Sequence, residues 1–192
     1  MTTLAAIQGN GWSVIGCDSR SSDDNGRPVN MVTNKIIDNN GILIAGSGSG
    51  RGSNILQFGW KAPKPSMGQD LDIFITQSFI PQMRKAFIDA GYDMKEDGDA
   101  AEHDSAFIIS VKGVIYPIFE DYSWDRDSSN VYYSGSGGDV ALGAMQALGI
   151  EDAQGPEDAE RIIHKAIEIA SEWDIFTNGP IITKIQFAKT KI

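Results

Sequence analysis

The start of the chain carries the residues with the clearest capacity for chemistry. The sequence opens with Met1, Thr2 and Thr3. If Met1 is removed, Thr2 holds a free amine and a hydroxyl on the same residue. An N-terminal amine titrates near neutral pH, at about 7.7–8.0, so it can act as a base for its own side chain. We therefore hypothesise a threonine nucleophile that stays inactive while Met1 keeps its nitrogen in an amide.

The residues that follow predict a β-hairpin that returns the chain to its start. Residues 3–8 and 12–17 are rich in β-branched and apolar side chains and predict two strands. Asn10-Gly11 between them favours a type I′ turn, which needs positive φ at both central positions. The hairpin places Asp18 beside the N-terminus, and a polar loop is expected over residues 19–28.

Composition excludes several classes of protein. The chain of 192 residues has a net charge of -10 and no arginine-rich run, so a nucleic-acid partner is not expected. No apolar run approaches the roughly 20 residues of a membrane span, and the N-terminus lacks the charged region of a secretory signal. Cys17 is the one cysteine and is predicted to be buried. A chain without a disulfide framework is expected in a reducing compartment, here the cytoplasm.

A glycine-rich segment follows the apolar strand predicted over residues 42–45. Gly46 to Gly50 alternates glycine with serine, as some phosphate-binding loops do. The P-loop needs Gly-Lys-Ser/Thr before its helix, whereas Arg51 and Ser53 follow here. We favour a turn whose backbone N–H groups can face an oxyanion or a peptide. A nucleotide-binding module remains an alternative.

The middle of the chain predicts a helix, a loop and a hairpin. Residues 71–90 have the apolar spacing of a helix that Asp70 or Gln69 could cap and Gly91 could end. Pro81 should kink this helix or split it in two. The acidic stretch 93–104 predicts a surface loop. His103 within it is expected to be solvated and not to bind a metal, because no second histidine or cysteine lies nearby. Residues 105–119 predict the hairpin.

The last third of the chain predicts a strand, two helices and a final strand. A short strand at residues 131–133 enters a Ser-Gly turn at 134–138, and a helix follows. A longer amphipathic helix begins at Pro156. The last strand is expected over residues 181–188, before a basic tail at 189–192.

The order of these elements favours an α+β fold. The strands cluster in hairpins and do not alternate singly with helices, which argues against a doubly wound parallel sheet. Two antiparallel sheets stacked between helical layers satisfy the pattern, because each strand is apolar enough to be buried and each helix has one apolar stripe. Neither a repeat nor a domain boundary is evident, so residues 1–192 are predicted to form one domain.

Several blocks of the sequence resemble proteasome β-type subunits, and most of all the bacterial HslV peptidase. They are the Thr-Thr start, Ile-Gly-Cys-Asp18-Ser-Arg, Lys35, Ile-Ala-Gly46, Ser-Gly-Ser136-Gly and the stretch from Ile167 to Gly179 with Trp-Asp174-Ile-Phe-Thr177. Each block alone is weak, but together they occur in the right order with threonine at the N-terminus. The resemblance implies an N-terminal-nucleophile (Ntn) hydrolase with a four-layer αββα sandwich.

The resemblance also implies roles for individual residues. Thr2 would supply the nucleophile and its amine the base, and Lys35 would stand beside it and lower the pKa of that amine. Asp18 would pair with Lys35. Gly46 would offer its backbone N–H to the developing oxyanion. A second polar shell near the amine is implied for Ser136, Asp174 and Thr177.

Each of these residues also has an ordinary structural explanation. Asp18 could cap a turn, Lys35 could be a surface lysine, and Ser136 could belong to the chemistry of its turn. One site accounts for all of them together, and this favours the catalytic interpretation.

The activity implied is that of a threonine-type endopeptidase subunit that hydrolyses unfolded polypeptides without a cofactor or a metal. Stacked homo-oligomeric rings, six- or seven-fold, and an ATPase unfoldase partner are implied as well. Two alternatives stay open besides the nucleotide module. One is a small-molecule amidase of the same superfamily, and the other is a catalytically silent ring subunit.

Overall fold

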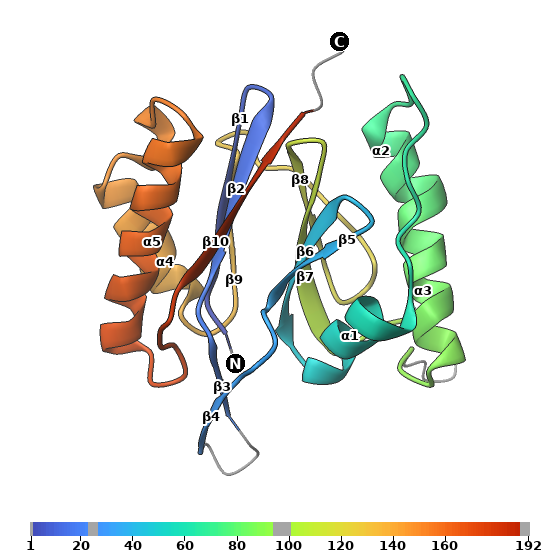
Figure 1. Ribbon diagram of the computed structural model, residues 1–192, viewed down its shortest axis with the longest axis horizontal. Helices are drawn as coiled ribbons and strands as arrows, with labels where there is room; N and C mark the ends of the chain where they lie inside the picture. Colours follow the sequence, from blue (N-terminus) through green and yellow to red (C-terminus); the bar gives the residue numbers. More distant parts are fainter. Residues whose placement is uncertain (1, 23–26, 94–100, 189–192) are drawn as a thin grey trace.

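The protein forms four layers, with two antiparallel sheets packed face to face between two layers of helices (Figure 1). This arrangement comes from a computed structural model that describes residues 2–22, 27–93 and 101–188. Met1 and the predicted basic tail lie outside these residues. The predicted α+β fold, with two antiparallel sheets between helical layers, is confirmed.

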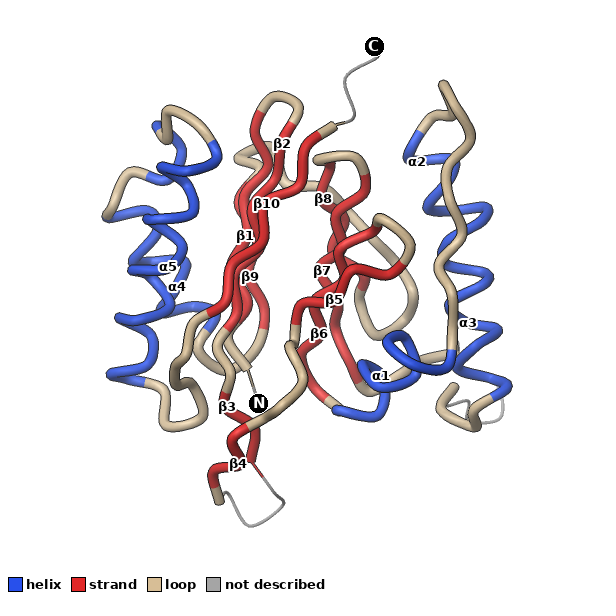
Figure 2. The backbone as a smooth tube through the Cα atoms, viewed as in Figure 1, coloured by secondary structure: helices blue, strands red, loops and turns tan. Residues whose placement is uncertain are grey.

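The first sheet has the strand order β10-β2-β1-β9, and the second has the order β5-β6-β7-β8 (Figure 2). The strands of the first sheet are β1 (Leu4–Gly9), β2 (Trp12–Cys17), β9 (Val131–Ser134) and β10 (Ile182–Phe187). Those of the second are β5 (Ile36–Asn39), β6 (Ile42–Gly48), β7 (Ser105–Val111) and β8 (Val114–Ile118).

The helices lie in one layer on each side of the sheets. One layer contains α4 (Gly138–Ala147), the short η3 (Ile150–Asp152) and α5 (Pro156–Trp173). The other contains α1 (Gly50–Asn54), η1 (Ile55–Gly59), α2 (Leu71–Phe74), η2 (Ile75–Phe79) and α3 (Ile80–Asp89). Among the described residues, no helix combines the length and the apolar character that a bilayer span requires.

The hairpin at the start of the chain forms as predicted. Strands β1 and β2 pair antiparallel with Gly9 opposite Trp12. The predicted type I′ turn is wrong, because Gly11 has φ +79 whereas Asn10 is not among the described residues with positive φ. The loop predicted over residues 19–28 is partly wrong, because β3 (Arg20–Ser22) pairs with β4 (Pro28–Asn30) in a small separate hairpin. Polar composition concealed this hairpin, which projects from the end of the sandwich and needs no apolar face (Figure 1).

Three hydrophobic clusters fill the spaces between the layers. The amphipathic helix α5 shows how the sequence directs this packing, because its buried residues recur at three- and four-residue spacing and face the first sheet. They are Ala159, Ile162, Ile163, Ala166, Ile167 and Ala170. Burying one isoleucine side chain contributes about 1.5–3 kcal/mol, so this stripe fixes α5 against β1 and β2. Cys17 is buried in the cluster between the sheets, as predicted.

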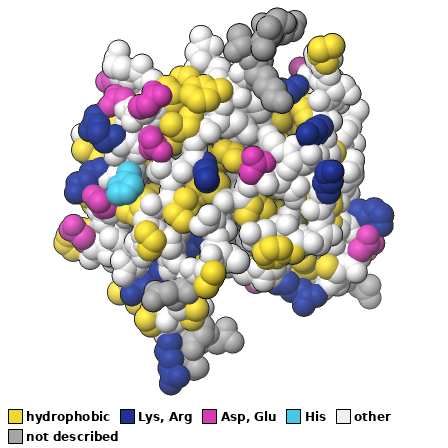
Figure 3. Space-filling view, in the orientation of Figure 1, with side chains coloured by type: hydrophobic (Ala, Val, Ile, Leu, Met, Phe, Trp, Pro, Cys, Tyr) yellow, Lys and Arg dark blue, Asp and Glu magenta, His cyan; other side chains and the backbone are white. Residues whose placement is uncertain are grey.

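The segment with Pro81 changes its helical form. Asp70 caps it, accepting a hydrogen bond from the Ile73 N–H at 3.0 Å, and Gly91 ends it with φ +64. Between α2 and α3 the backbone widens into η2, a π-helical turn that ends directly before α3. Pro81 lies in the first turn of α3, where its missing N–H is tolerated. The helical residues run without a break from Leu71 to Asp89, so the predicted split in two is wrong. Charged side chains of both signs are scattered over the face of the molecule seen in Figure 3.

The prediction that His103 is solvated is wrong. Its side chain is 1% exposed and makes ring contacts with Phe87, Phe107 and Tyr122. Neither ring nitrogen has a hydrogen-bond partner within the part of the chain that the structure describes. Burial lowers the pKa of His103 to about 4, although the nearby carboxylates of Asp93, Asp121 and Asp104 oppose the shift. The acidic residues around His103 in the sequence led to the wrong prediction, because Phe87 of α3 covers its ring.

This burial makes the stability of the fold dependent on pH. The unfolded chain protonates His103 near 6.5, whereas the folded chain does so only near 4. The unfolded state therefore binds more protons in this window, and stability falls as the pH is lowered through it. We expect His103 to account for a loss of about 2 kcal/mol between pH 7.5 and 5.

Urea unfolding followed at both pH values measures this loss, and the His103→Leu variant should lose correspondingly less. The half-exposed His164 offers the matched control, because His164→Gln should follow the wild-type pH dependence. Parallel curves for His103→Leu and wild type would contradict the assignment.

Candidate active site

A buried carboxylate organises the start of the chain. Asp18 follows β2 and is 0% exposed. Its Oδ1 accepts hydrogen bonds from the backbone N–H of Thr3 at 2.9 Å and from Lys35 Nζ at 2.7 Å. Its Oδ2 accepts from the backbone N–H groups of Arg20 at 2.9 Å and of Asn178 at 3.3 Å. The carboxylate thus has a cation and three backbone donors, which offset the cost of its burial.

A second network is formed by hydroxyl groups around Asp174, just after α5. Its Oδ2 accepts hydrogen bonds from Ser136 Oγ at 2.7 Å and from Thr177 Oγ1 at 2.6 Å. The Thr177 hydroxyl also lies 2.5 Å from the Thr3 hydroxyl. Three predicted site residues from the β9–α4 turn and the segment after α5 are therefore joined to the N-terminal strand.

Thr3 is the residue that connects the two networks, and our sequence analysis assigned it no role. Its backbone N–H binds Asp18, and its hydroxyl binds Thr177. The only signal in the sequence is the doubled threonine at the start. Since Thr3 is held at both its backbone and its side chain, the position of the preceding residue is also constrained.

Two glycines let the turn after β9 approach the N-terminus closely. Gly135 has φ +88, and a Cβ there would collide with the carbonyl oxygen of Thr2. A Cβ on Gly137 would collide with the Thr3 hydroxyl and would come within 2.8 Å of Thr177 Oγ1. The Ser-Gly pattern of this turn therefore reflects space for the backbone as well as turn geometry.

Thr2 lines an open cleft of about 890 Å³. The residue is 5% exposed, and its hydroxyl has no hydrogen-bond partner among the residues that the structure describes. Ser136 lines the same cleft. The other walls come from β3, from the end of β6 and the start of α1, from the start of β7, from the β9–α4 turn, and from the residues after β8 and α5. The residues are Ser21, Ser22, Ser47, Gly48, Ser49, Gly50, Asp104, Ala106, Glu120, Ser134, Gly135 and Phe176.

Lys35 and Gly46 lie together at another small pocket, which Ser53 also lines. Lys35 is 9% exposed, with its ammonium on Asp18. Gly46 lies opposite Phe107 in the β6–β7 pair, and a Cβ at this position would come within 2.5 Å of Ser53 Oγ and 2.9 Å of the Phe107 ring. Glycine is therefore required here by packing, whatever its backbone N–H does.

The segment from Gly46 to Gly50 is not the turn that the sequence predicted. Its first three residues are the end of β6 and pair with β7, and Ser49 alone separates β6 from α1. Ser49 caps that helix through a 3.3 Å hydrogen bond from the Arg51 N–H, and the Arg51 guanidinium donates to the Ala90 carbonyl at 2.5 Å. Both groups that might have faced a phosphate thus have partners within the protein. Among the described residues, no group of three or more histidine, cysteine or carboxylate side chains is arranged to hold a metal.

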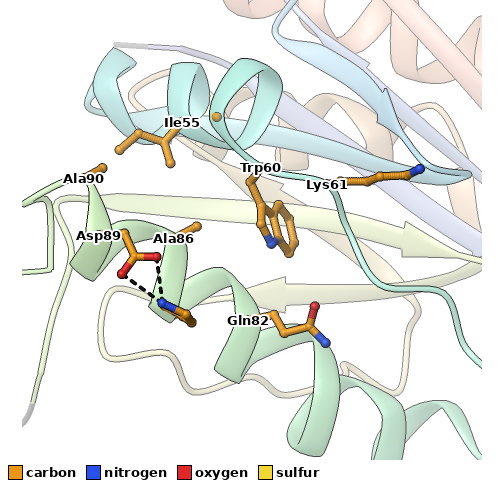
Figure 4. Close-up of a pocket in the computed structure, with 9 residues that line it drawn as sticks. Ile55, Trp60, Lys61, Gln82, Ala86, Asp89 and Ala90 are labelled. Atoms are coloured by element: carbon orange, nitrogen blue, oxygen red, sulfur yellow. Dashed lines mark hydrogen bonds and ion pairs between the residues drawn. The ribbon is translucent and has the colours of Figure 1, made fainter.

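A separate pocket of about 450 Å³ lies between η1 and α3 (Figure 4). Trp60, Gln82 and Ala86 line it, and the ion pair between Lys85 and Asp89, with a separation of 2.8 Å, lies at its edge. None of the predicted site residues lines this pocket. The predicted site residues lie at the Thr2 cleft and in the two networks, except Gly46, which lies with Lys35 at the small pocket and does not line the cleft.

Solved structures with this fold cover nearly the whole chain. BPH, a β-proteasome homologue from Thiobacillus denitrificans, in complex with epoxomicin has a TM-score of 0.76 and 21% identity over 98% of this chain and 100% of its own. A second BPH structure has a TM-score of 0.73 and 21% identity over 99% and 100%. Eukaryotic HslV from Trypanosoma brucei has a TM-score of 0.65 and 20% identity over 97% and 99%.

No protein-family model and no curated protein matches the sequence. At these identities the structural likeness establishes the fold. The chain has the fold of proteasome β-type subunits and HslV, as its sequence blocks predicted.

The Asp18 network yields a prediction about stability. Asp18→Asn would leave the Lys35 ammonium buried without its counter-charge, which typically costs about 3–5 kcal/mol. Urea unfolding followed by tryptophan fluorescence should show a loss of this size. The matched control is Asp89→Asn, which breaks the exposed pair with Lys85 and should change stability by less than about 1 kcal/mol. Equal effects of the two substitutions would show that Asp18 does not organise the fold.

Proposed function

We propose that the mature chain is a threonine-type endopeptidase of the proteasome-like kind, with Thr2 as its nucleophile. One observation carries this proposal. Thr3 is fixed at its backbone by Asp18 and at its side chain by Thr177, while the hydroxyl of the adjacent Thr2 is left unpaired at a cleft. A hydroxyl that is held in place but has no partner is available for a substrate.

The proposed chemistry begins when removal of Met1 frees the amine of Thr2. This amine takes the hydroxyl proton, and Oγ1 attacks the carbonyl carbon of the scissile peptide bond. The tetrahedral intermediate collapses as the amine passes the proton to the leaving nitrogen, and an ester with Thr2 remains. Water then attacks the ester with the same amine as base, which restores the hydroxyl and releases the second product.

Lys35 and Gly46 would assist two different groups in this reaction, the amine base and the oxyanion. The Lys35 ammonium, held by Asp18 at 2.7 Å, would favour the neutral form of a nearby amine and so lower its pKa. The backbone N–H of Gly46 would donate to the oxyanion, a contribution of about 3 kcal/mol in comparable sites. Both roles follow from the family resemblance. Lys35 is also joined to the N-terminal strand, because Asp18 binds both its ammonium and the Thr3 N–H.

The hydroxyl network would position the base. Ser136 lines the cleft with Thr2, and its hydroxyl is oriented by Asp174, which also binds Thr177. A carboxylate that accepts two hydroxyl hydrogen bonds fixes the direction of both donors. We propose that this shell holds the amine of Thr2 through Ser136 and Thr3.

An unfolded polypeptide is the substrate that suits this cleft. Its walls include the β3 strand and the end of β6, whose extended backbone can pair with an extended peptide. We further propose a cytoplasmic enzyme, assembled as homo-oligomeric stacked rings and supplied with substrate by an ATPase unfoldase. The support for this assembly is the fold shared with BPH and HslV.

Substitution of the nucleophile tests the proposal. Thr2→Ala should abolish hydrolysis of fluorogenic peptides and denatured casein, whereas Thr2→Ser should keep a measurable fraction because it retains the hydroxyl. Epoxomicin, which BPH binds, should bind the mature wild type and not Thr2→Ala. Intact mass spectrometry identifies the form without Met1 that each assay requires.

The outcomes separate this function from its alternatives. Equal rates for wild type and Thr2→Ala would contradict it. Cleavage of small amides but not of casein would favour an amidase. A persistent Met1 with no activity in any assay would favour a silent ring subunit.

A further inference from the structure

The lining of the Thr2 cleft has an unbalanced charge. Most of its side chains are small and carry hydroxyl groups, or belong to glycine. Asp104 and Glu120 are its two charged residues, and no lysine or arginine lies among the described residues that line it. The lining of the cleft is thus polar and negatively charged, and only a peptide with a positive charge would make use of this charge.

Both acidic residues are held in place by their backbones. The carbonyl of Asp104 accepts a hydrogen bond from the Ser49 N–H at 2.9 Å, and Gly48 packs so closely that a Cβ there would lie 2.8 Å from the same oxygen. The carbonyl of Glu120 accepts from the His103 N–H at 2.9 Å. The ends of β7 and β8 therefore present the two carboxylates at the rim of one cleft.

Neither carboxylate has a side-chain partner within the described ranges. The neighbouring cations are bound elsewhere, since Lys35 pairs with Asp18 and Arg51 donates to the Ala90 carbonyl. Both residues are exposed, so their carboxylates give the rim of the cleft a negative potential that salt screens.

The same cleft holds an independent sign of a ligand. Thr2 is only 5% exposed and lines the cleft. Its hydroxyl has no partner among the described residues. A molecule that reaches this hydroxyl also faces Asp104 and Glu120. No third metal-ligating side chain joins the two carboxylates within the described part of the chain, so the positive charge must come with the substrate.

We propose that Asp104 and Glu120 make the enzyme selective for polypeptides with a lysine or arginine side chain near the scissile bond. This selectivity rests on the proposed peptidase function and names its substrate class. The two residues act on binding and do not take part in the bond-breaking steps. An exposed ion pair of this kind changes affinity by up to about fivefold, so two of them should produce a preference of about tenfold that salt weakens.

Acetylated fluorogenic peptides test the selectivity. In each peptide one position on either side of the scissile bond carries arginine or citrulline, which has nearly the same shape but no charge. The mature wild type should show a kcat/KM ratio of arginine to citrulline near tenfold at one or more positions. The ratio should fall at high ionic strength.

Two variants assign the effect to its residues. Asp104→Asn and Glu120→Gln should each lower the ratio severalfold, and the double variant should bring it close to one. The matched control Glu157→Gln removes an exposed negative charge from the first turn of α5, outside the cleft, and should leave the ratio unchanged.

The possible failures are distinguishable. Thr2-dependent cleavage without any preference for arginine, or a preference that both variants retain, would overturn the selectivity and leave the peptidase function standing. Absence of Thr2-dependent cleavage of every peptide would overturn the peptidase function and the selectivity with it.

Discussion

The buried carboxylate of Asp18 is the interaction on which the arrangement of the site depends. Thr3 and Asp18 flank the first hairpin, Lys35 precedes β5 in the other sheet, and Asn178 belongs to the segment before β10. One side chain thus ties two sheets and a distant loop together at one end of the sandwich. Because a buried carboxylate needs donors on both oxygens, these segments must meet at that end for the fold to form.

The hydroxyl network adds a second constraint that meets the first at Thr3. Asp174 and Thr177 approach from the end of α5, and Ser136 approaches from the turn after β9. The first sheet and the helical layer beside it therefore contribute to the same network. Beside these paired groups, the hydroxyl of Thr2 has no partner among the described residues and lies at the cleft, where an external molecule can reach it.

Sequence reasoning succeeded where the signal was local. Asn10-Gly11 specified the first hairpin, Asp70 and Gly91 marked the ends of a helical segment, and Pro156 marked the start of α5. These features depend on a few consecutive residues, so the fold class and most elements could be derived from them. The blocks around Asp18 and Ser136 added the family resemblance that the structural likeness supports.

Other features could not be predicted because distant segments create them. His103 is buried by Phe87 of α3 and by Tyr122 beyond β8, and nothing in its acidic surroundings indicates this. Thr3 acquires its two roles from partners 15 and 174 residues away. The acidic rim forms only when the start of β7 lies beside the end of β8, which brings Asp104 and Glu120 to one cleft.

The placement of β1 has a practical consequence for handling the protein. Strand β1 starts at the end of the sandwich near β3, whereas β10 ends at the opposite end (Figure 1). An affinity tag fused upstream would start beside the Thr2 cleft and would keep the nitrogen of Thr2 in an amide. A tag fused downstream would leave from the far side, which makes it the appropriate handle for purification and for immobilising the molecule on a surface.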